Sequence, residues 1–293
     1  GDDEASLHPR PETLADLDVL LFDIQDVGAR YYTYQATLGY IMEVAGGTDT
    51  RVVVLDRPNP IDGMTLEGNV VQPGFESFVS AYPLAVRHAM TMGEMGVFFQ
   101  KMVGIECAFE VIQCEGWRRD QWWDETGLPW VFPSPNMPTL ETAAIYPGMC
   151  LIEGTNLSEG RGTTRPFHLV GAPWLNRDRF LHLVRQGASD AGLRGVGFRA
   201  ATFEPRFQKH AGEVCHGIEL MVEERKAMNA WLLGMVVLEA ALRADPEHFR
   251  WRTETYEYVD NPIAIDLLCG SGEIRVGLES RIRPTELMET WAP

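Results

Sequence analysis

The stretch DVLLFDIQD, residues 18–26, decides the fold class of this sequence. Its apolar run ends in carboxylates, which is typical of a strand buried on both faces of a parallel sheet. Residues 31–45 follow with apolar side chains at helical spacing and stop at a Gly-Gly pair. Residues 51–56, RVVVLD, read as a second β-branched strand. Strand, helix and strand in this order predict a right-handed βαβ unit, and therefore a parallel α/β sheet.

The pattern continues along the chain. Residues 91–94, TMGE, form a capping box that begins a helix running to about residue 103. Residues 108–112 predict another strand, and Thr139 caps a short helix to residue 145. The apolar run MCLIE, residues 149–153, predicts a last strand that delivers Glu153 to the edge of the sheet.

The sequence changes character after residue 173. We expect an α/β domain over residues 1–165 and a smaller α+β auxiliary domain over residues 166–293, with the boundary between about residues 160 and 170. In the second domain the pattern predicts an amphipathic helix, two strands and a long apolar helix. These elements cover residues 178–191, 196–203, 217–222 and 225–244.

Charge and composition exclude several functions. The chain has 293 residues, with 25 basic and 42 acidic side chains and a net charge of −17, so its mean field repels nucleic acid and anionic lipid. No apolar run is long enough to span a membrane, and the N-terminus has no signal-peptide core, so the chain as given is expected to be soluble. The five cysteines lack CxxC spacing and the seven histidines lack metal-ligand spacing, so we expect no cofactor.

The most polar run is EGTNLSEGRGTTRPF, residues 153–167. It has almost no apolar side chain to bury, and its three glycines allow a ligand to approach the backbone closely. This composition predicts a binding loop; an ordinary surface loop is the alternative.

Carboxylates are expected at one edge of the sheet. Ligands of open α/β sheets bind beyond the carboxyl ends of the strands, where Asp23, Asp26 and Asp56 follow the first two strands and Glu153 the last. The Gly-rich turn of a dinucleotide site is absent after residue 26. Paired carboxylates suit glycoside hydrolysis, and they equally suit a Mg²⁺ site built from Asp23, Asp26 and Asp56. Composition alone leaves both chemistries open.

Four strings carry a family resemblance. LFDIQDVGARYYTY, VVVLDRPNP, PSPNMPTLETA and EGTNLSEGRGTTRPF, which begin at residues 21, 52, 133 and 153, resemble the NamZ-type exo-β-N-acetylmuramidases, also called the YbbC-like family. The resemblance implies a Rossmann-like domain followed by an auxiliary domain, with the active cleft between them. Relatives usually carry a Pro-Glu-His-Gly segment, with a candidate catalytic Glu, upstream of the first strand, and this sequence starts after that point.

The resemblance also implies a function. Its members remove terminal β-linked N-acetylmuramic acid from the non-reducing ends of peptidoglycan fragments, which implies disaccharide and muropeptide substrates and a secreted or periplasmic location. A non-catalytic muropeptide-binding protein is the remaining alternative. Muramic acid carries a lactyl carboxylate, so an acidic protein needs placed guanidiniums such as Arg30, Arg161 or Arg165 to hold it.

Candidate site residues follow from the edge of the sheet and the polar loop. The expected catalytic carboxylates are Glu153, Glu159 and Asp23, and partial burial of Glu153 would raise its pKa as a general acid requires. Structural roles are the alternatives: Glu153 as the partner of a loop arginine, Glu159 as a solvated carboxylate and Asp23 as a group that orients Arg30 or Tyr32. The expected substrate-binding residues are Asp26, Arg30, Tyr32, Asn136, Asn156, Arg161, Thr163, Thr164 and Arg165.

Overall fold

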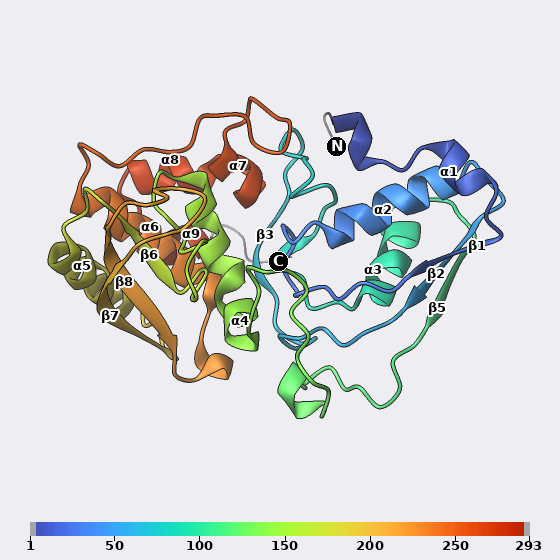
Figure 1. The fold of residues 1–293 in the computed structure, drawn as a ribbon, viewed down its shortest axis with the longest axis horizontal. Helices are drawn as coiled ribbons and strands as arrows, with labels where there is room; N and C mark the ends of the chain where they lie inside the picture. The colour runs from blue at the N-terminus through green and yellow to red at the C-terminus, as the bar shows by residue number, and fades with distance from the viewer. Residues whose placement is uncertain (1–3, 290–293) are drawn as a thin grey trace.

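The structure, a computed structural model, describes residues 4–289, so the outer ends of the two predicted domains, residues 1–3 and 290–293, lie outside the described residues. Two lobes lie side by side (Figure 1). One contains a parallel sheet and the N-terminal helices, and the other contains an antiparallel sheet and the C-terminal helices. No helix between residues 4 and 289 is both long and apolar enough to cross a membrane.

The first lobe confirms the predicted parallel α/β sheet. Strands β1 (Val19–Phe22), β2 (Arg51–Leu55) and β5 (Phe109–Ile112) pair in parallel in the order β1-β2-β5. Helix α2 (Tyr34–Ala45) connects β1 to β2, as expected, and α3 (Met92–Phe98) begins at the predicted Thr91 capping box. The remaining short elements are η1 (Glu4–Leu7), α1 (Pro11–Ala15), the π-helix η2 (Phe99–Val103) and η3 (Trp123–Glu125).

The expectation that β1 is buried on both faces is wrong. Val19 is 44% exposed and Leu21 61% exposed, whereas Phe22 is buried. The alternation arises because successive strand side chains point to opposite faces, and α2 and α3 pack on the face that carries Phe22.

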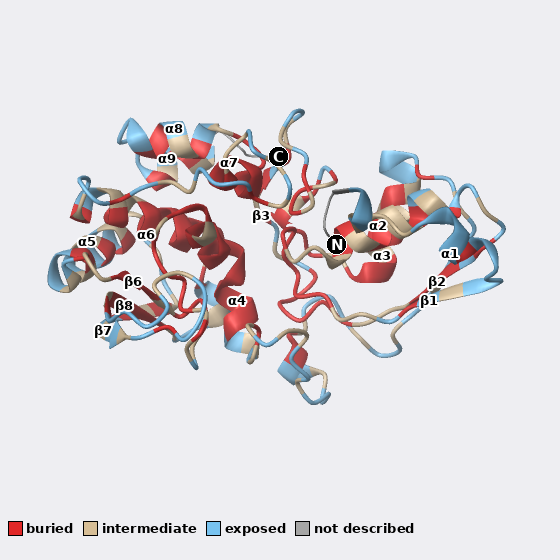
Figure 2. Cartoon of the chain, turned by 45° about the horizontal axis from the view of Figure 1, so that its top comes forward, coloured by how far each residue is buried: buried red, intermediate tan, exposed pale blue. Residues whose placement is uncertain are grey.

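A small antiparallel pair joins the lobes. Strands β3 (Glu67–Val70) and β4 (Ala85–Arg87) lie between them in Figure 1, and Figure 2 colours much of this junction as buried. Glu67 Oε1 accepts a hydrogen bond from Arg87 at 2.7 Å, while its Oε2 accepts one from the backbone N–H of Trp231 in the second lobe at 2.9 Å. This buried carboxylate therefore links the two lobes.

Arg30 has the same structural role, which corrects its predicted part in substrate binding. The side chain is fully buried. Its guanidinium donates to the carbonyl oxygens of Asn69 and Leu84, both at 2.7 Å, and of Leu268 at 3.0 Å. Because three backbone carbonyls from both lobes hold it, Arg30 is not accessible to a ligand.

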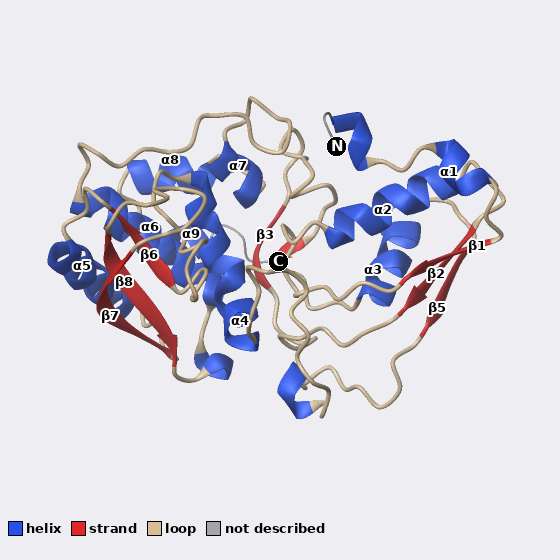
Figure 3. Cartoon of the chain, viewed as in Figure 1, coloured by secondary structure: helices blue, strands red, loops and turns tan. Residues whose placement is uncertain are grey.

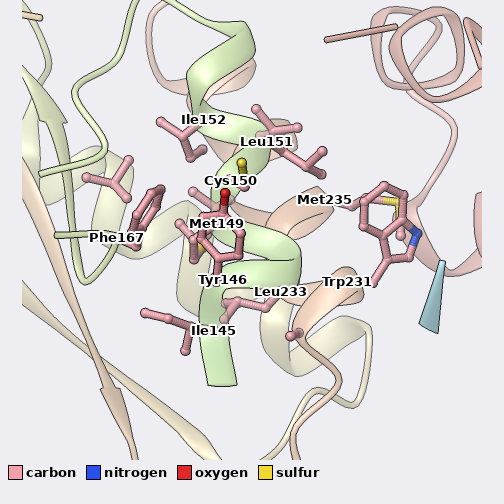
Figure 4. Packing of buried hydrophobic residues seen from close by; sticks show 14 of the residues in the cluster. Ile145, Tyr146, Met149, Cys150, Leu151, Ile152, Phe167, Trp231, Leu233 and Met235 are labelled. Carbon is pink, nitrogen blue, oxygen red and sulfur yellow. The ribbon is translucent and has the colours of Figure 1, made fainter. Parts of the chain in front are cut away.

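The predicted strand at residues 149–153 is also wrong. Helix α4 (Leu140–Met149), capped by Thr139 as expected, continues into the 3-10 helix η4 (Cys150–Gly154). It packs against α6 (Ala230–Ala244), and at the crossing a Cβ on Gly148 would clash with the carbonyl of Ala230. Figure 4 shows the apolar side chains of α4 and η4 packed all round, so this short run lacks the helical periodicity that would have identified it.

The second lobe has the expected α+β character. Strands β6 (Leu169–Ala172), β8 (Cys215–Val222) and β7 (Val196–Phe203) pair antiparallel in the order β6-β8-β7, as Figure 3 shows. Helix α5 (Arg177–Asp190) forms where predicted, while the long helix begins at Ala230 after the 3-10 turn η5 (Arg225–Ala227). The C-terminal tail forms three short helices, α7 (Ala264–Cys269), α8 (Glu273–Glu279) and α9 (Pro284–Glu289).

The packing of α4 places the division between the lobes earlier than the sequence suggested. Since α4 and η4 share a core with α6 and α7, residues 140–165 belong to the second lobe, not to the first. The polar loop therefore starts from the core of the second lobe.

Candidate active site

The polar loop and a segment of the C-terminal tail face each other across a cavity. Thr155 and Trp251 form an antiparallel bridge, in which Asn156 N donates to Arg250 O at 3.0 Å and Arg252 N donates to Gly154 O at 2.9 Å. Residues from both segments line a cavity of about 990 Å³. A second cavity of about 240 Å³ shares four of these residues, Glu153, Arg161, Tyr256 and Glu257, and extends to Tyr32.

Glu153 lies where the two cavities meet. Its Oε1 accepts hydrogen bonds from Arg161 Nε at 3.2 Å and Nη2 at 2.5 Å, and its Oε2 accepts one from the Tyr256 hydroxyl at 3.0 Å. Both oxygens of Glu153 therefore accept hydrogen bonds from described residues. The interpretation of Glu153 as the partner of a loop arginine is confirmed.

Glu159 is not a solvated carboxylate. Its side chain is 2% exposed, and it pairs with Arg161 Nε at 3.4 Å and with Lys209 Nζ at 2.9 Å. Lys209 also donates to the carbonyl oxygens of Ile152, Thr155 and Leu157. This buried ion cluster fixes the path of the loop beside the cavity.

Arg161 joins the two carboxylates. Its guanidinium lies 5.0 Å from the centre of the Phe167 ring. Burial lowers its pKa, but the charge of Glu153, its hydrogen bond to Arg161 and the nearby Tyr146 together outweigh this effect, so the pKa of Arg161 is raised. The guanidinium stays charged, and its charge is matched by Glu153 and Glu159.

Glu257 reaches the same place from a strained turn. Tyr256 and Val259 donate backbone hydrogen bonds to each other at 3.0 and 2.9 Å, which leaves Glu257 and Tyr258 as the two central residues of a tight hairpin. Both have left-handed φ values, 49° and 67°, which cost a non-glycine residue about 1–2 kcal/mol. Strain of this kind concentrates at functional sites.

The surroundings of Glu257 differ from those of Glu153. Its side chain is partly buried, lines both cavities and makes no hydrogen bond or ion pair with any described residue. Burial, and after it the charge of Glu153, raise the pKa of Glu257, while Arg252 opposes the shift. Two carboxyl groups whose environments differ in this way are what acid–base catalysis requires.

Two arginines of the same segment have uncommitted charges. Arg250 donates to the carbonyl of Phe249 at 2.6 Å, and Arg252 donates to the carbonyl of Thr255 at 3.3 Å and lies over the Tyr256 ring. Neither forms an ion pair with a carboxylate in the described part of the chain, and both line the larger cavity. The cavity can therefore hold an anionic group.

The other predicted binding residues are distributed unevenly. Tyr32 lines the smaller cavity and stacks edge-on against Tyr146. Asn156 lines the larger one, but its side chain is engaged with His248 O at 2.9 Å and Arg250 N at 3.0 Å. Burial raises the pKa of Tyr32, so its hydroxyl stays protonated.

Besides Arg30 and the strand-end aspartates, four further predicted residues do not line these two cavities. Asn136 lies within the turn ahead of α4 that the hydrogen bond from Met137 N to Ser134 O closes, and Thr164 is exposed. The Thr163 hydroxyl makes hydrogen bonds within the loop: it donates to Gly160 O at 2.6 Å and accepts from Arg165 N at 3.0 Å. Arg165 points to Glu219 of β8 and Glu141 of α4, at 3.4 and 3.8 Å.

The strand-end aspartates do not form one site. Asp23 pairs with Arg57 at 2.6 Å, Asp26 contacts His88 at 3.2 Å, and Asp56 accepts from Thr91 and Gly93 at 2.8 Å each. Asp23 lines a separate, mostly apolar cavity of about 490 Å³. Among residues 4–289, no three His, Cys, Asp or Glu side chains lie in a metal-binding arrangement.

The structure adds residues that the sequence did not indicate. Lys209, Arg250, Arg252 and Glu257 come from segments without a recognisable motif. The turn at Glu257 even lacks the Asn-Gly pair that identifies a tight hairpin in sequence.

Fold and site together define a two-lobed α/β protein with a carboxylate- and guanidinium-lined cavity in its second lobe. The chain belongs to the NamZ family: the family model described as "Exo-beta-N-acetylmuramidase NamZ, N-terminal" matches residues 4–141, and the corresponding C-terminal model matches residues 144–293. The two models meet just after the start of α4, in agreement with the division between the lobes.

A curated relative and two solved structures are also similar to this chain. The chain is 42% identical over 272 residues to the peptidoglycan β-N-acetylmuramidase NamZ of Bacillus subtilis strain 168; the match covers 93% of this chain and 63% of that protein. Two DUF1343-family crystal structures from Bacteroides fragilis NCTC 9343 each cover 97% of the chain. One has 29% identity and a TM-score of 0.82 over 77% of its own length. The other, at 24% identity, TM-score 0.73 and 73% coverage, supports the fold alone.

Proposed function

We propose that the protein is an exo-acting glycoside hydrolase that removes terminal β-linked N-acetylmuramic acid from the non-reducing ends of peptidoglycan fragments. The observation that carries the proposal is the cavity between the polar loop and residues 250–257. It combines Glu153, which accepts hydrogen bonds on both oxygens, with Glu257 and two uncommitted arginines. The family relationship supports the same activity, because a relative that this chain matches over 63% of its length is named for it.

The chemistry needs two carboxyl groups in different protonation states. Hydrolysis of a glycoside uses one carboxylic acid to protonate the leaving oxygen and a carboxylate on the other side of the sugar. Glu153 accepts hydrogen bonds on both oxygens, whereas Glu257 accepts none from the described residues and burial raises its pKa, so we assign the two states to this pair. Glu159 stabilises the loop through Arg161 and Lys209.

The uncommitted arginines account for the choice of sugar. N-Acetylmuramic acid differs from N-acetylglucosamine by its lactyl carboxylate, and a guanidinium without a carboxylate partner is the group best suited to bind it. Arg252 and Arg250 meet this condition in the larger cavity, whereas Arg161 is already paired. We therefore assign recognition of the lactyl group to Arg252 and Arg250.

A hydrolysis assay tests the function. The full-length gene product is incubated with 4-nitrophenyl β-glycosides of N-acetylmuramic acid and of N-acetylglucosamine between about pH 5 and 8, the range in which a tuned carboxyl pair works. We expect release from the muramic acid glycoside only, unchanged by EDTA. Binding without release at any pH would favour a non-catalytic muropeptide-binding protein, and loss of activity with EDTA would favour a metal-dependent hydrolase.

A variant tests the recognition. Arg252→Gln should weaken binding of the muramic acid substrate about 10- to 100-fold, the effect of losing a charged hydrogen bond, and leave residual N-acetylglucosamine binding unchanged. Arg283→Gln, an exposed arginine of the helix α9 region that pairs with Glu286, is the matched control. An equal loss of affinity for both sugars would mean that Arg252 does not recognise the lactyl carboxylate.

A further inference from the structure

Glu257 occupies a position that a purely structural carboxylate has no reason to occupy. The hairpin from Tyr256 to Val259 places it at a left-handed position, and the next residue, Tyr258, is left-handed as well. Gly, Asn or Asp adopts this conformation at lower cost. A glutamate there costs about 1 kcal/mol or more in backbone strain. Its carboxyl group makes no hydrogen bond or ion pair with the described residues that would offset this cost.

The turn directs this carboxyl group into the junction of the two cavities. Glu257 lines both of them together with Glu153, Arg161 and Tyr256. Tyr256, the residue before it, donates its hydroxyl to Glu153 Oε2 at 3.0 Å, so the same turn that places Glu257 also holds Glu153. One hydrogen-bonded turn thus contacts Glu153 and carries Glu257.

The charged and titratable groups around Glu257 come from several elements. Glu153 comes from η4, Arg161 from the polar loop, and Arg252 from the strand-like segment that pairs with that loop. The smaller cavity adds five tyrosines, Tyr31, Tyr32, Tyr34, Tyr146 and Tyr256. The larger cavity adds the charged or titratable side chains of Glu159, Lys209, His210, Arg250 and Glu254. Burial and the charge of Glu153 disfavour a second negative charge here, and Arg252 acts in the opposite direction.

We propose that Glu257 is the proton donor of the cavity, the carboxylic acid that protonates the leaving oxygen of the glycosidic bond. This inference rests on the proposed glycosidase function and adds a catalytic residue to it. The proton moves from the Glu257 carboxyl to the glycosidic oxygen as the bond from that oxygen to C1 breaks, so the leaving sugar departs as a neutral alcohol. Water supplies the oxygen that then bonds to C1, and one of its protons restores the Glu257 carboxyl.

The leaving group distinguishes a proton donor from a structural residue. A disaccharide with an alcohol leaving group needs the proton, whereas 4-nitrophenolate departs without it. Glu257→Gln should therefore lower kcat/KM for the N-acetylmuramic acid–N-acetylglucosamine disaccharide about 10²- to 10⁴-fold, the usual contribution of general acid catalysis. For the 4-nitrophenyl glycoside the loss should be below about 10-fold.

The matched control is Glu247→Gln, which removes an exposed carboxylate outside both cavities and should change neither substrate. Equal losses for the two substrates after Glu257→Gln, or no loss for either, would overturn the assignment. Wild-type protein that cleaves neither substrate would refute the proposed function instead. In that case carboxyl ¹³C NMR, with Glu257→Gln assigning the resonance, decides the inference: a midpoint above the ordinary Glu value of about 4.3 supports it, and one at or below that value overturns it.

Discussion

Replacing Lys209 with Met tests whether a buried ion cluster holds the polar loop. In wild type the Nζ atom pairs with Glu159 at 2.9 Å and donates to three loop carbonyls at 2.7 to 3.0 Å. Met keeps the aliphatic stem but leaves the 2%-exposed carboxylate of Glu159 with Arg161, at 3.4 Å, as its one remaining ion-pair partner among the described residues. Breaking a buried pair costs about 3–5 kcal/mol, and the remaining arginine favours the lower end, so we expect a loss of about 3 kcal/mol.

The sign of a second substitution makes this prediction specific. Adding Glu159→Gln to Lys209→Met removes the stranded charge, so the double variant should be more stable than Lys209→Met alone. Guanidinium unfolding followed by tryptophan fluorescence gives the free energies of unfolding. The control is Lys226→Met, which removes an exposed pair with Glu125 and should cost less than about 1 kcal/mol.

The reasoning would be refuted if Lys209→Met lost no more stability than Lys226→Met. It would also be refuted if Glu159→Gln lowered the stability of Lys209→Met by as much as it lowers that of wild type. Either result would mean that the cluster contributes little to the loop.

Three further predictions follow from the packing and the charges. Gly234→Ala should destabilise the protein by about 3 kcal/mol or more in thermal unfolding, because the new Cβ would clash with the Gly148 carbonyl. The control Gly47→Ala has room for a Cβ and should change the free energy of unfolding by no more than about 0.5 kcal/mol. Similar effects of the two substitutions would contradict the close helix crossing. Burial lowers the pKa of His168 below its usual 6.5, so its contribution to stability is complete above pH 6.5 and is lost at lower pH, where the unfolded chain takes up the proton. His168→Gln should therefore make the melting temperature fall less steeply between about pH 6.5 and 5. An unchanged slope would contradict this prediction. Arg161→Gln should reduce binding of muramic acid and glucosamine substrates alike, because its charge is committed to two carboxylates, and a selective loss for muramic acid would return the lactyl group to Arg161.

Local sequence patterns predicted those parts of the fold whose stabilising contacts are local. The β1-α2-β2 unit and the Thr91 capping box were predicted because periodicity and caps act over a few residues. The run at residues 149–153 was assigned to a strand because a short, fully apolar segment has no period, and packing against α6 makes it helical. The exposed face of β1 likewise depends on which helices cover the sheet.

Only half of the site was predicted, because local sequence patterns do not report contacts between distant segments. The polar loop was recognisable from its composition, and Glu153, Glu159 and Arg161 do lie together there. Glu257 and Arg252 lie about a hundred residues further along the chain, in a segment without a motif. The Thr155–Trp251 bridge and the hydrogen bond from Tyr256 to Glu153 bring this segment to the loop. The sequence pattern placed the strand-end aspartates at one edge of the sheet. In the structure each contacts a nearby residue instead, namely Arg57, His88 or Gly93.

A crystal structure of the full-length gene product with N-acetylmuramic acid tests the central claim most directly. The sugar is predicted to lie in the cavity between the polar loop and residues 250–257, with its lactyl carboxylate within hydrogen-bonding distance of Arg252 or Arg250 and its ring beside Glu153 and Glu257. Density for the sugar in the apolar cavity beside Asp23, with the residue 250–257 cavity empty, would contradict it.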